Sequence, residues 1–140
     1  MSAEENKETI RQFVEQYINN KNLGASDQFF APNYVAHNVF SGAMPSSERQ
    51  KDLQAMIGTA VPDRQFIIED IVAEDDQVVI RGTHRGTHSG QVGDVPPSGK
   101  AVSWSGVSIV RMVDGKAEES WHYGNFLAVM QVLGIPYANT

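Results

Sequence analysis

The sequence predicts an α+β fold, a cone-shaped α+β barrel in which N-terminal helices pack on a curved antiparallel sheet and a short helix ends the chain. Two observations predict this class. Apolar residues before residue 60 follow a helical period, and from Gln65 onward β-branched runs alternate with turn residues. A length of 140 residues, with 41% hydrophobic residues and no cysteine, fits one domain that builds its core without disulfides. We therefore expect residues 1–140 to form a single domain.

The first part of the chain predicts helices. One apolar set recurs at i, i+3, i+4, i+7 and i+8, as on one face of a helix: Ile10, Phe13, Val14, Tyr17 and Ile18. This set predicts an amphipathic helix over residues 3–20. Residues 26–30 predict a short second helix that ends before Pro32, and residues 34–37 predict a brief strand. Residues 46–58 predict a third helix.

Four strands are predicted from β-branched runs, at residues 66–73, 77–88, 101–113 and 116–123. Asp75-Asp76 and Asp114-Gly115 stand where tight hairpins are expected, so these strands form an antiparallel meander. Residues 89–100 contain three glycines and two prolines and are interpreted as a flexible lip. Apolar residues at 126, 129, 130 and 133 predict the short terminal helix.

The net charge of -6, without a run of Lys or Arg, argues against nucleic acid or an anionic membrane as the main partner. The polar N-terminal segment also lacks an apolar stretch of signal-peptide or membrane-spanning type. We therefore expect a cytoplasmic protein whose partners are small molecules or proteins.

The most informative motifs lie in the C-terminal half of the chain. They are Arg81-Gly82-Thr83-His84-Arg85-Gly86-Thr87-His88-Ser89-Gly90, Val95-Pro96-Pro97-Ser98-Gly99-Lys100, Asp114-Gly115-Lys116, Glu119-x-Trp121-x-x-x-Asn125-x-Leu127 and Leu133-Gly134-Ile135-Pro136. In this order and register they resemble the SnoaL-like polyketide cyclases of the nuclear-transport-factor-2-like superfamily. The resemblance implies a cone with a closed apolar interior and one open mouth, which suits a flat, mainly apolar ligand.

The resemblance also implies a reaction. The family removes an acidic proton next to a ketone and an ester, without a cofactor, and the enolate attacks a carbonyl of the same molecule. We expect an ester cyclase or isomerase of this kind, acting by intramolecular aldol chemistry on a polyketide-type or other apolar carbonyl compound. Two alternatives stay open. One is a non-catalytic small-molecule-binding protein of the same fold, and the other is a hydrolase or dehydratase that orients a water molecule.

Asn125 stands where the family usually has the aspartate that acts as general acid and base. An amide cannot accept a proton from carbon, so we expect Asn125 to donate a hydrogen bond to the enolate oxygen. Asn is also a strong helix N-cap, and capping of the last helix is the structural alternative for this residue.

Proton transfer then needs another residue. His88, in a segment similar to the family's Gly-Thr-His-x-Gly, is the first candidate because imidazole suits proton transfer near pH 7, and a purely structural bond to a loop is its alternative. Glu119 is the second candidate, with an ion pair to Arg81 or Arg111 as its alternative. We expect no cofactor and no metal. In particular, His84 and His88 are four residues apart in a strand, which separates them by about 13 Å.

Substrate contacts are expected from aromatic residues. In the final strand, Glu119, Trp121, Tyr123 and Asn125 share one face, and Ser120 and His122 share the other. By resemblance the first set faces the cavity. Trp121 is expected to stack on a planar substrate, with a place in the core as the alternative. The other expected substrate-binding residues are Trp104, Tyr34, Phe13, Tyr17 and His37.

The resemblance further implies a homodimer, because members of the family commonly pair through their sheets. The predicted strands offer Val, Ile and Trp beside Ser and Arg on their exposed faces. Such a face is sufficient for a two-fold interface of about 800 Å² per partner.

Overall fold

The computed structural model describes residues 2–39, 42–44 and 47–135. Ser46, the first residue of the predicted third helix, and Pro136, the last residue of the C-terminal motif, lie outside these ranges. No helix within the described ranges is long and apolar enough to cross a membrane.

The helix predicted over residues 3–20 is present in two parts. α1 (Ala3–Phe13) begins with a capping box between Ser2 and Glu5, and it continues directly into the π-helical segment η1 (Val14–Asn19). The helices that follow are η2 (Leu23–Ala25), α2 (Ser26–Phe29), α3 (Ser47–Ala60) and α4 (Leu127–Leu133). Every helix predicted from the sequence is therefore confirmed, with small changes of bounds.

Within the described ranges, six strands form one sheet in the order β2-β1-β6-β5-β4-β3. They are β1 (Phe30–Val39), β2 (Gly42–Met44), β3 (Gln65–Glu74), β4 (Gln77–Thr87), β5 (Ala101–Val113) and β6 (Lys116–Gly124). Neighbouring strands from β3 to β6 are antiparallel, which confirms the predicted meander. β1 is longer than the strand predicted at residues 34–37, and it lies parallel to β6.

Both predicted hairpins are present. Asp75 has a φ of 53°, and Asp114 and Gly115 have φ values of 50° and 81°. Tight hairpin turns need this left-handed backbone region, which Asp and Gly enter at a lower cost than most residues. These turns join β3 to β4 and β5 to β6, and so make each of these two pairs neighbours in the sheet.

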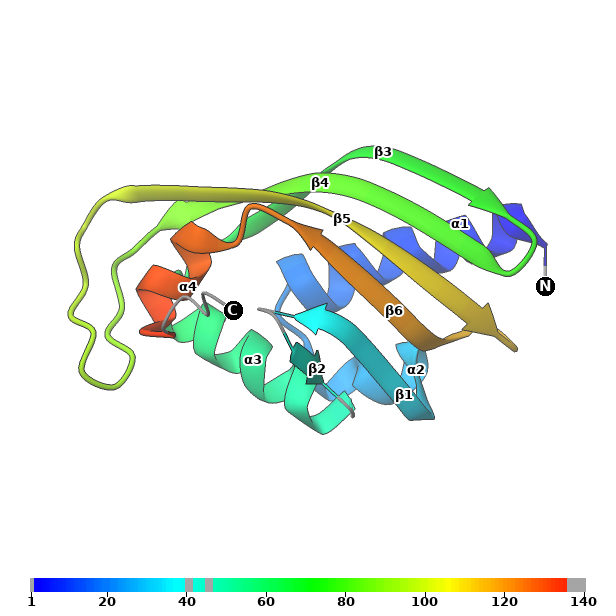
Figure 1. Ribbon diagram of the computed structural model, residues 1–140, viewed down its shortest axis with the longest axis horizontal. Helices are drawn as coiled ribbons and strands as arrows, with labels where there is room; N and C mark the ends of the chain where they lie inside the picture. Colours follow the sequence, from blue (N-terminus) through cyan, green and yellow to red (C-terminus); the bar gives the residue numbers. More distant parts are fainter. Residues whose placement is uncertain (1, 40–41, 45–46, 136–140) are drawn as a thin grey trace.

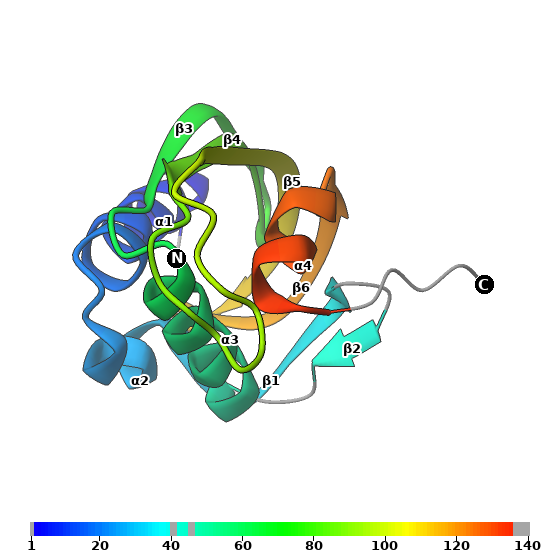
Figure 2. The same cartoon turned by 90° about the vertical axis from the view of Figure 1, so that its left-hand side faces the viewer.

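The sheet curls around the core, and the helices close its concave side (Figures 1 and 2). α1 contacts β3 and β4, α3 contacts β1, and α4 contacts β5. The α+β fold with the first helix on the concave face is thus confirmed. One core cluster lies between α1, η1 and the sheet, and includes Ile10, Tyr17, Phe30 and Val78. A second cluster joins α3, α4 and β5, and includes Leu53, Ile57, Trp104 and Val129.

β6 contains a β-bulge at Glu118. Arg111 of β5 pairs with Glu119, whereas the next pair is Met112 with Ala117, so Glu118 is an extra residue. Glu118 and Glu119 consequently lie on the same face of the sheet. Both accept a hydrogen bond from Nη2 of Arg111, each at 3.1 Å.

The connection between β4 and β5 packs against the end of α3. The backbone N–H of Gly90 donates to the carbonyl of Ala60 at 3.1 Å. The approach is so close that a Cβ on Gly90 would lie 1.7 Å from the carbonyl oxygen of Thr59. Val92 packs against the second core cluster. The segment predicted as a lip therefore rests on the helix beside it.

Candidate active site

A cavity of about 150 Å³ lies between the concave face of the sheet and the helices. Much of its lining is apolar, and includes Ile10, Phe13, Phe30 and Val110. Its polar lining residues include four from three neighbouring strands: Tyr34 of β1, Ser108 of β5, and Ser120 and His122 of β6. A few converging polar groups in an apolar cavity are typical of a small-molecule site.

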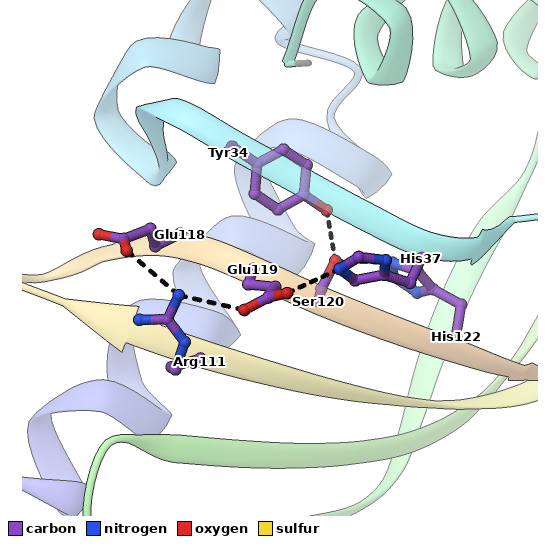
Figure 3. A network of polar contacts seen from close by, with 7 residues as sticks. All are labelled: Tyr34, His37, Arg111, Glu118, Glu119, Ser120 and His122. Carbon is purple, nitrogen blue, oxygen red and sulfur yellow. Dashed lines mark hydrogen bonds and ion pairs between the residues drawn. The ribbon is translucent and has the colours of Figure 1, made fainter. Parts of the chain in front are cut away.

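These four side chains form a continuous hydrogen-bonded chain. Tyr34 Oη lies 2.5 Å from Ser120 Oγ, which lies 2.8 Å from Nε2 of His122 (Figure 3). Nδ1 of His122 lies 2.7 Å from Ser108 Oγ. Each hydroxyl both donates and accepts, so the hydrogen bonds can run in either direction, with the tautomer of His122 set accordingly. A proton taken up at one end can thus be released at the other.

Strand register brings these residues together. Ser108 and His122 are direct partners across β5 and β6, and Ser120 lies two residues earlier on the same face as His122. Tyr34 comes from β1, where the neighbouring Val35 is opposite Glu119 of β6. The parallel pairing of β1 with β6 therefore delivers Tyr34 to the chain of hydroxyls.

Burial sets the protonation of His122 and Tyr34, the two titratable members of this chain. Burial, assisted by the charge of His37, lowers the pKa of His122 to about 4. His122 is therefore neutral at pH 7 and can accept a proton. Burial raises the pKa of Tyr34 to about 12, although its hydrogen bond to Ser120 acts in the opposite direction. Tyr34 therefore keeps its proton at pH 7 and can donate a hydrogen bond.

A second pocket of about 90 Å³ adjoins the cavity. The two spaces share four lining residues: Gln50, Gln54, His84 and His122. Arg64 and Trp104 also line the second pocket. The imidazole of His84 stacks on the indole of Trp104, with ring centroids 5.0 Å apart and planes at 15°. Burial, followed by the charge of Arg64, holds the pKa of His84 well below its usual value.

The predicted cavity-facing side of β6 is wrong. Glu119 and Trp121 lie on the outer, convex face of β6, opposite the cavity-lining residues Ser120 and His122. His37 of β1 lies on the same face, with its Nε2 2.7 Å from Glu119 Oε2 (Figure 3). Trp121 stacks on His37, with ring centroids 5.4 Å apart. Hydrogen bonds from His37 and then Arg111 hold the pKa of Glu119 below its usual range. The physical reason is that an ionised carboxylate costs less free energy at the surface beside Arg111 than in an apolar cavity.

Tyr123 and Asn125 are also outside the described cavity lining. Tyr123 is 51% exposed, and Asn125 is exposed just after the end of β6. The backbone N–H of Asn125 donates to the carbonyl of Ser105 at 3.0 Å. The N-cap of α4 is Phe126, which makes no side-chain capping bond. The interpretation of Asn125 as the helix cap is therefore wrong.

His88 lies at the base of the connection between β4 and β5 and is 5% exposed. Its Nδ1 accepts a hydrogen bond from the backbone N–H of Ser98 at 3.3 Å and lies 3.1 Å from Ser98 Oγ. Its backbone N–H donates to the carbonyl of Lys100 at 2.9 Å. The structure therefore places His88 where it joins the two ends of this connection, outside the described lining of both pockets.

Of the aromatic residues expected at the substrate, Phe13 and Tyr34 line the central cavity and Trp104 lines the adjoining pocket. Tyr17 is fully buried and stacks on Phe13, with ring centroids 5.1 Å apart. Within the described ranges, no three His, Cys, Asp or Glu side chains gather closely enough to hold a metal ion.

Sequence reasoning found Tyr34 but missed the other three residues of the hydrogen-bonded chain, Ser108, Ser120 and His122. The predicted alternation of Ser120 and His122 with Glu119 and Trp121 is correct, but the structure places Ser120 and His122 on the side that lines the cavity. Strand register then identifies Ser108 as the partner of His122. A further signal lies in α3, where two glutamines four residues apart, Gln50 and Gln54, occupy the buried side of the helix together with Leu53 and Ile57. We find no local sequence signal for Arg64.

Comparison with known proteins agrees with this architecture. The sequence profile of the family described as SnoaL-like polyketide cyclase matches residues 8–133. The chain belongs to this family. No curated protein sequence matches the chain. Membership of the SnoaL-like polyketide cyclase family supports an enzymatic role of the general cyclase or isomerase type.

Several solved structures are similar over nearly the whole chain. AclR from Streptomyces galilaeus, a proposed hydroxylase, is 32% identical with a TM-score of 0.82, covering 95% of this chain and 98% of AclR. IdmH from Streptomyces antibioticus, a proposed polyketide cyclase, is 26% identical with a TM-score of 0.77, covering 92% and 98% of the two chains. A proposed SnoaL-like polyketide cyclase from Jannaschia sp. CCS1 is 22% identical with a TM-score of 0.79, and the match covers 96% of this chain and 94% of the Jannaschia chain. This structure shares the fold of the SnoaL-like family.

Proposed function

We propose that this protein is a cofactor-independent cyclase or isomerase that removes a proton next to a carbonyl group of a small, mainly apolar substrate. The observation that carries this proposal is the hydrogen-bonded chain from Tyr34 through Ser120 and His122 to Ser108, inside an apolar cavity. The enolate formed by proton removal attacks a second carbonyl of the same molecule, which closes a ring without a redox step.

His122 is the proposed base. It is neutral at pH 7 because burial lowers its pKa to about 4. A pKa this low makes a weak base in the empty cavity. The enolate supplies a negative charge beside the imidazole as the proton arrives, and this charge raises the pKa of His122 in the transition state. When Nε2–H of His122 donates to Ser120, the accepting nitrogen is Nδ1, which lies 2.7 Å from Ser108 Oγ. Ser108 then takes the proton from the substrate carbon as it passes its own hydroxyl proton to Nδ1.

Tyr34 is the proposed hydrogen-bond donor to the enolate oxygen. When Ser120 donates to Tyr34, the hydroxyl hydrogen of Tyr34 is available to a substrate oxygen. A fixed donor in an apolar site stabilises a developing oxyanion more than water does. Confinement also contributes, because holding two carbons of one flexible chain together lowers the barrier by roughly 7–11 kcal/mol in ideal cases.

This proposal moves proton transfer away from the residues that the sequence suggested. Asn125, His88 and Glu119 are not among the described residues that line the cavity, whereas His122 is. The rival function is a non-catalytic binding protein of the same fold. A proton-exchange experiment separates the two, because a binding protein holds a carbonyl compound without removing its proton.

Hydrogen–deuterium exchange tests the proposal. Methyl benzoylacetate, an apolar β-keto ester, is incubated in D₂O near pH 6, and loss of its α-proton is followed by NMR with and without protein. We expect the protein to accelerate exchange above the buffer rate. His122→Gln should reduce this acceleration by about 10²-fold or more, as removal of a general base does. The matched control is His37→Gln, a histidine on the outer face, which should change it less than twofold.

The outcomes decide between the two functions. Binding of the ester without faster exchange would support the binding protein and overturn the proposal. If His122→Gln and His37→Gln reduce the acceleration of exchange equally, His122 is not the base. Circular dichroism and thermal unfolding establish that both variants are folded before their exchange rates are compared.

A further inference from the structure

Arg64 is a buried cation without an anionic partner among the described residues. It follows α3, immediately precedes β3, and is 2% exposed. Its Nη2 donates to Oε1 of Gln54 at 2.6 Å, but Gln54 is neutral. Its Nε and Nη1 have no hydrogen-bond partner in the described part of the chain, where no ion pair includes Arg64.

Arg64 remains charged at neutral pH. Burial lowers the pKa of its guanidinium to about 10, which is still well above 7. An unpaired buried charge and two unsatisfied donor groups are expensive in free energy, and native proteins seldom leave them so. Such an arrangement at the wall of a pocket fits a ligand that supplies the missing negative charge.

Other unsatisfied polar atoms occur in the same region. Nδ1 of His84 and Oε1 of Gln50 are buried without a hydrogen-bond partner among the residues that the structure describes, and both residues line the pocket with Arg64. The hydroxyl of Tyr17, which interacts electrostatically with Arg64, is likewise unpartnered. Apolar walls come from Leu53, Ile57, Trp104 and Phe126. The pocket thus combines one cation, scattered hydrogen-bonding groups and aromatic surface.

We propose that Arg64 binds a carboxylate group of the substrate in this pocket, so that the substrate class is a planar, largely apolar carboxylic acid. The proposal rests on the function proposed for the adjoining cavity, which would hold the carbonyl-bearing part of the same molecule. The two spaces are neighbours, because Gln54, His84 and His122 are among the residues that line both, and a ligand that reaches from one into the other would contact these side chains.

A carboxylate fits better than the other oxygen groups. A neutral ester or amide carbonyl satisfies N–H donors but leaves the charge of Arg64 uncompensated. A phosphate carries up to two negative charges, whereas Arg64 is the only Lys or Arg among the described lining residues of the two spaces. A single carboxylate matches a single guanidinium in both charge and hydrogen-bonding geometry.

Calorimetric titration with two planar probes tests this inference. The probes are 2-naphthoate and 2-naphthamide, which have similar shape and each contain a carbonyl oxygen but differ in charge. We expect the unmodified protein to bind 2-naphthoate about 10- to 100-fold more tightly than 2-naphthamide, as expected for a charge-assisted hydrogen bond. Arg64→Gln should lose this preference while its affinity for 2-naphthamide changes less than threefold. The control is Arg11→Gln, an exposed arginine on α1, which should keep the preference.

Each outcome bears on the inference. Equal affinity of the unmodified protein for the two probes, or no binding of either, would overturn it without any variant. A preference for 2-naphthoate that survives in Arg64→Gln would overturn it as well. If Arg64→Gln fails to fold, Arg64→Lys replaces it in the test. This variant keeps the positive charge and should retain a weaker preference for 2-naphthoate. Equal affinity of Arg64→Lys for the two probes would count against the proposal. Failure of the proposed function is distinct, because it appears as absent proton exchange while the preference for 2-naphthoate persists.

Discussion

The carboxylate of Glu119 lies 2.7 Å from Nε2 of His37, on the convex face of the sheet. A paired carboxylate and imidazole is the arrangement found in many catalytic sites, yet here Arg111 shares the carboxylate and Trp121 covers the imidazole. The pair therefore joins β1 to β6 from outside, while the hydroxyl chain of Tyr34 and Ser120 joins the same strands from inside.

Glu119→Gln should reduce thermal stability at pH 7 and leave proton exchange unchanged. The folded-state pKa of Glu119 is lowered, chiefly by its bond to His37 and then by Arg111. Its contribution to stability is therefore complete above the unfolded pKa and disappears as pH falls through the folded value. The difference in melting temperature between Glu119→Gln and the parent should shrink toward pH 3. Glu8→Gln, at an exposed i,i+3 pair on α1, is the control and should show little difference at either pH.

The protein should lose stability as pH falls from about 6.5 to 4. The pKa of His122 is about 4 in the folded protein and 6.5 in the reference state, so the unfolded chain binds more protons in this window. Full protonation of this one residue costs about 3 kcal/mol of unfolding free energy. Denaturant titrations at several pH values give the slope of the unfolding free energy against pH. In His122→Gln this slope should correspond to up to one proton fewer than in the parent. The slope that remains is due to His84, whose pKa is also lowered by burial. An unchanged slope would show that His122 is not buried in its neutral form.

Asn125→Asp should not restore the acid/base chemistry that the family usually places at this position. Asn125 is exposed and outside the described cavity lining, so a carboxylate there would be in solvent. We expect proton exchange within twofold of the parent and an unfolding free energy within about 0.5 kcal/mol, as for other surface changes. A rate that rises with pH through a carboxylate pKa in this variant would show that Asn125 reaches the substrate.

Gly90→Ala should destabilise the fold, whereas Gly58→Ala should stabilise it. A Cβ at Gly90 would lie 1.7 Å from the carbonyl oxygen of Thr59, so the backbone must move, at a cost of about 1–3 kcal/mol. Gly58 lies within α3, and no atom of the described part of the chain lies within 4 Å of the added Cβ. Ala there should contribute about 0.5–1 kcal/mol through helix propensity. Chemical denaturation of the two variants measures the sign of each change in unfolding free energy. Similar effects of the two substitutions would contradict the close packing of the β4–β5 connection on α3.

We propose that the protein is a homodimer that pairs through the convex face of the sheet. Large apolar side chains are exposed on this face. They are Ile67 and Val72 of β3, 46% and 58% exposed, and Tyr123 of β6, 51% exposed. Light scattering should give twice the chain mass of 15.4 kDa at micromolar concentration. Val72→Glu should shift the mass toward the monomer, because a charge in an apolar interface lacks a partner. A monomer mass for the parent across this range is the opposing result.

Much of the fold is predictable because its signals are local. The turn residues Asp75 and Asp114 mark the hairpins, and the apolar set from Ile10 to Ile18 marks the first helix. The parallel pairing of β1 with β6 has no such local signal, since it joins residues about 85 positions apart, such as Val35 and Glu119. Its consequence, the arrival of Tyr34 at the site, was therefore only partly predictable.

The site is harder to predict than the fold for a specific reason. Alternation along a strand separates two sets of side chains, but it does not say which set faces inward. In β6 the aromatic and charged set, Glu119 and Trp121, lies outside, because Arg111 and His37 provide partners there. Arg64 is a different case, since it is buried in the connection between α3 and β3, where neither a helical nor a strand period applies.

The bulge at Glu118 gives β6 one position at which its length can change without consequence for the cavity. Deleting Glu118 would remove the extra residue and leave Ala117 and Ser120 on the inner face, with His122 still opposite Ser108. Deleting Trp121 or His122 would instead shift the strand by one residue from that point onward. The side chains after the deletion would then change faces, from inner to outer or from outer to inner. Among natural relatives, insertions and deletions in this strand should therefore concentrate next to Glu118, where the sheet absorbs a change in length and the cavity keeps its chemistry.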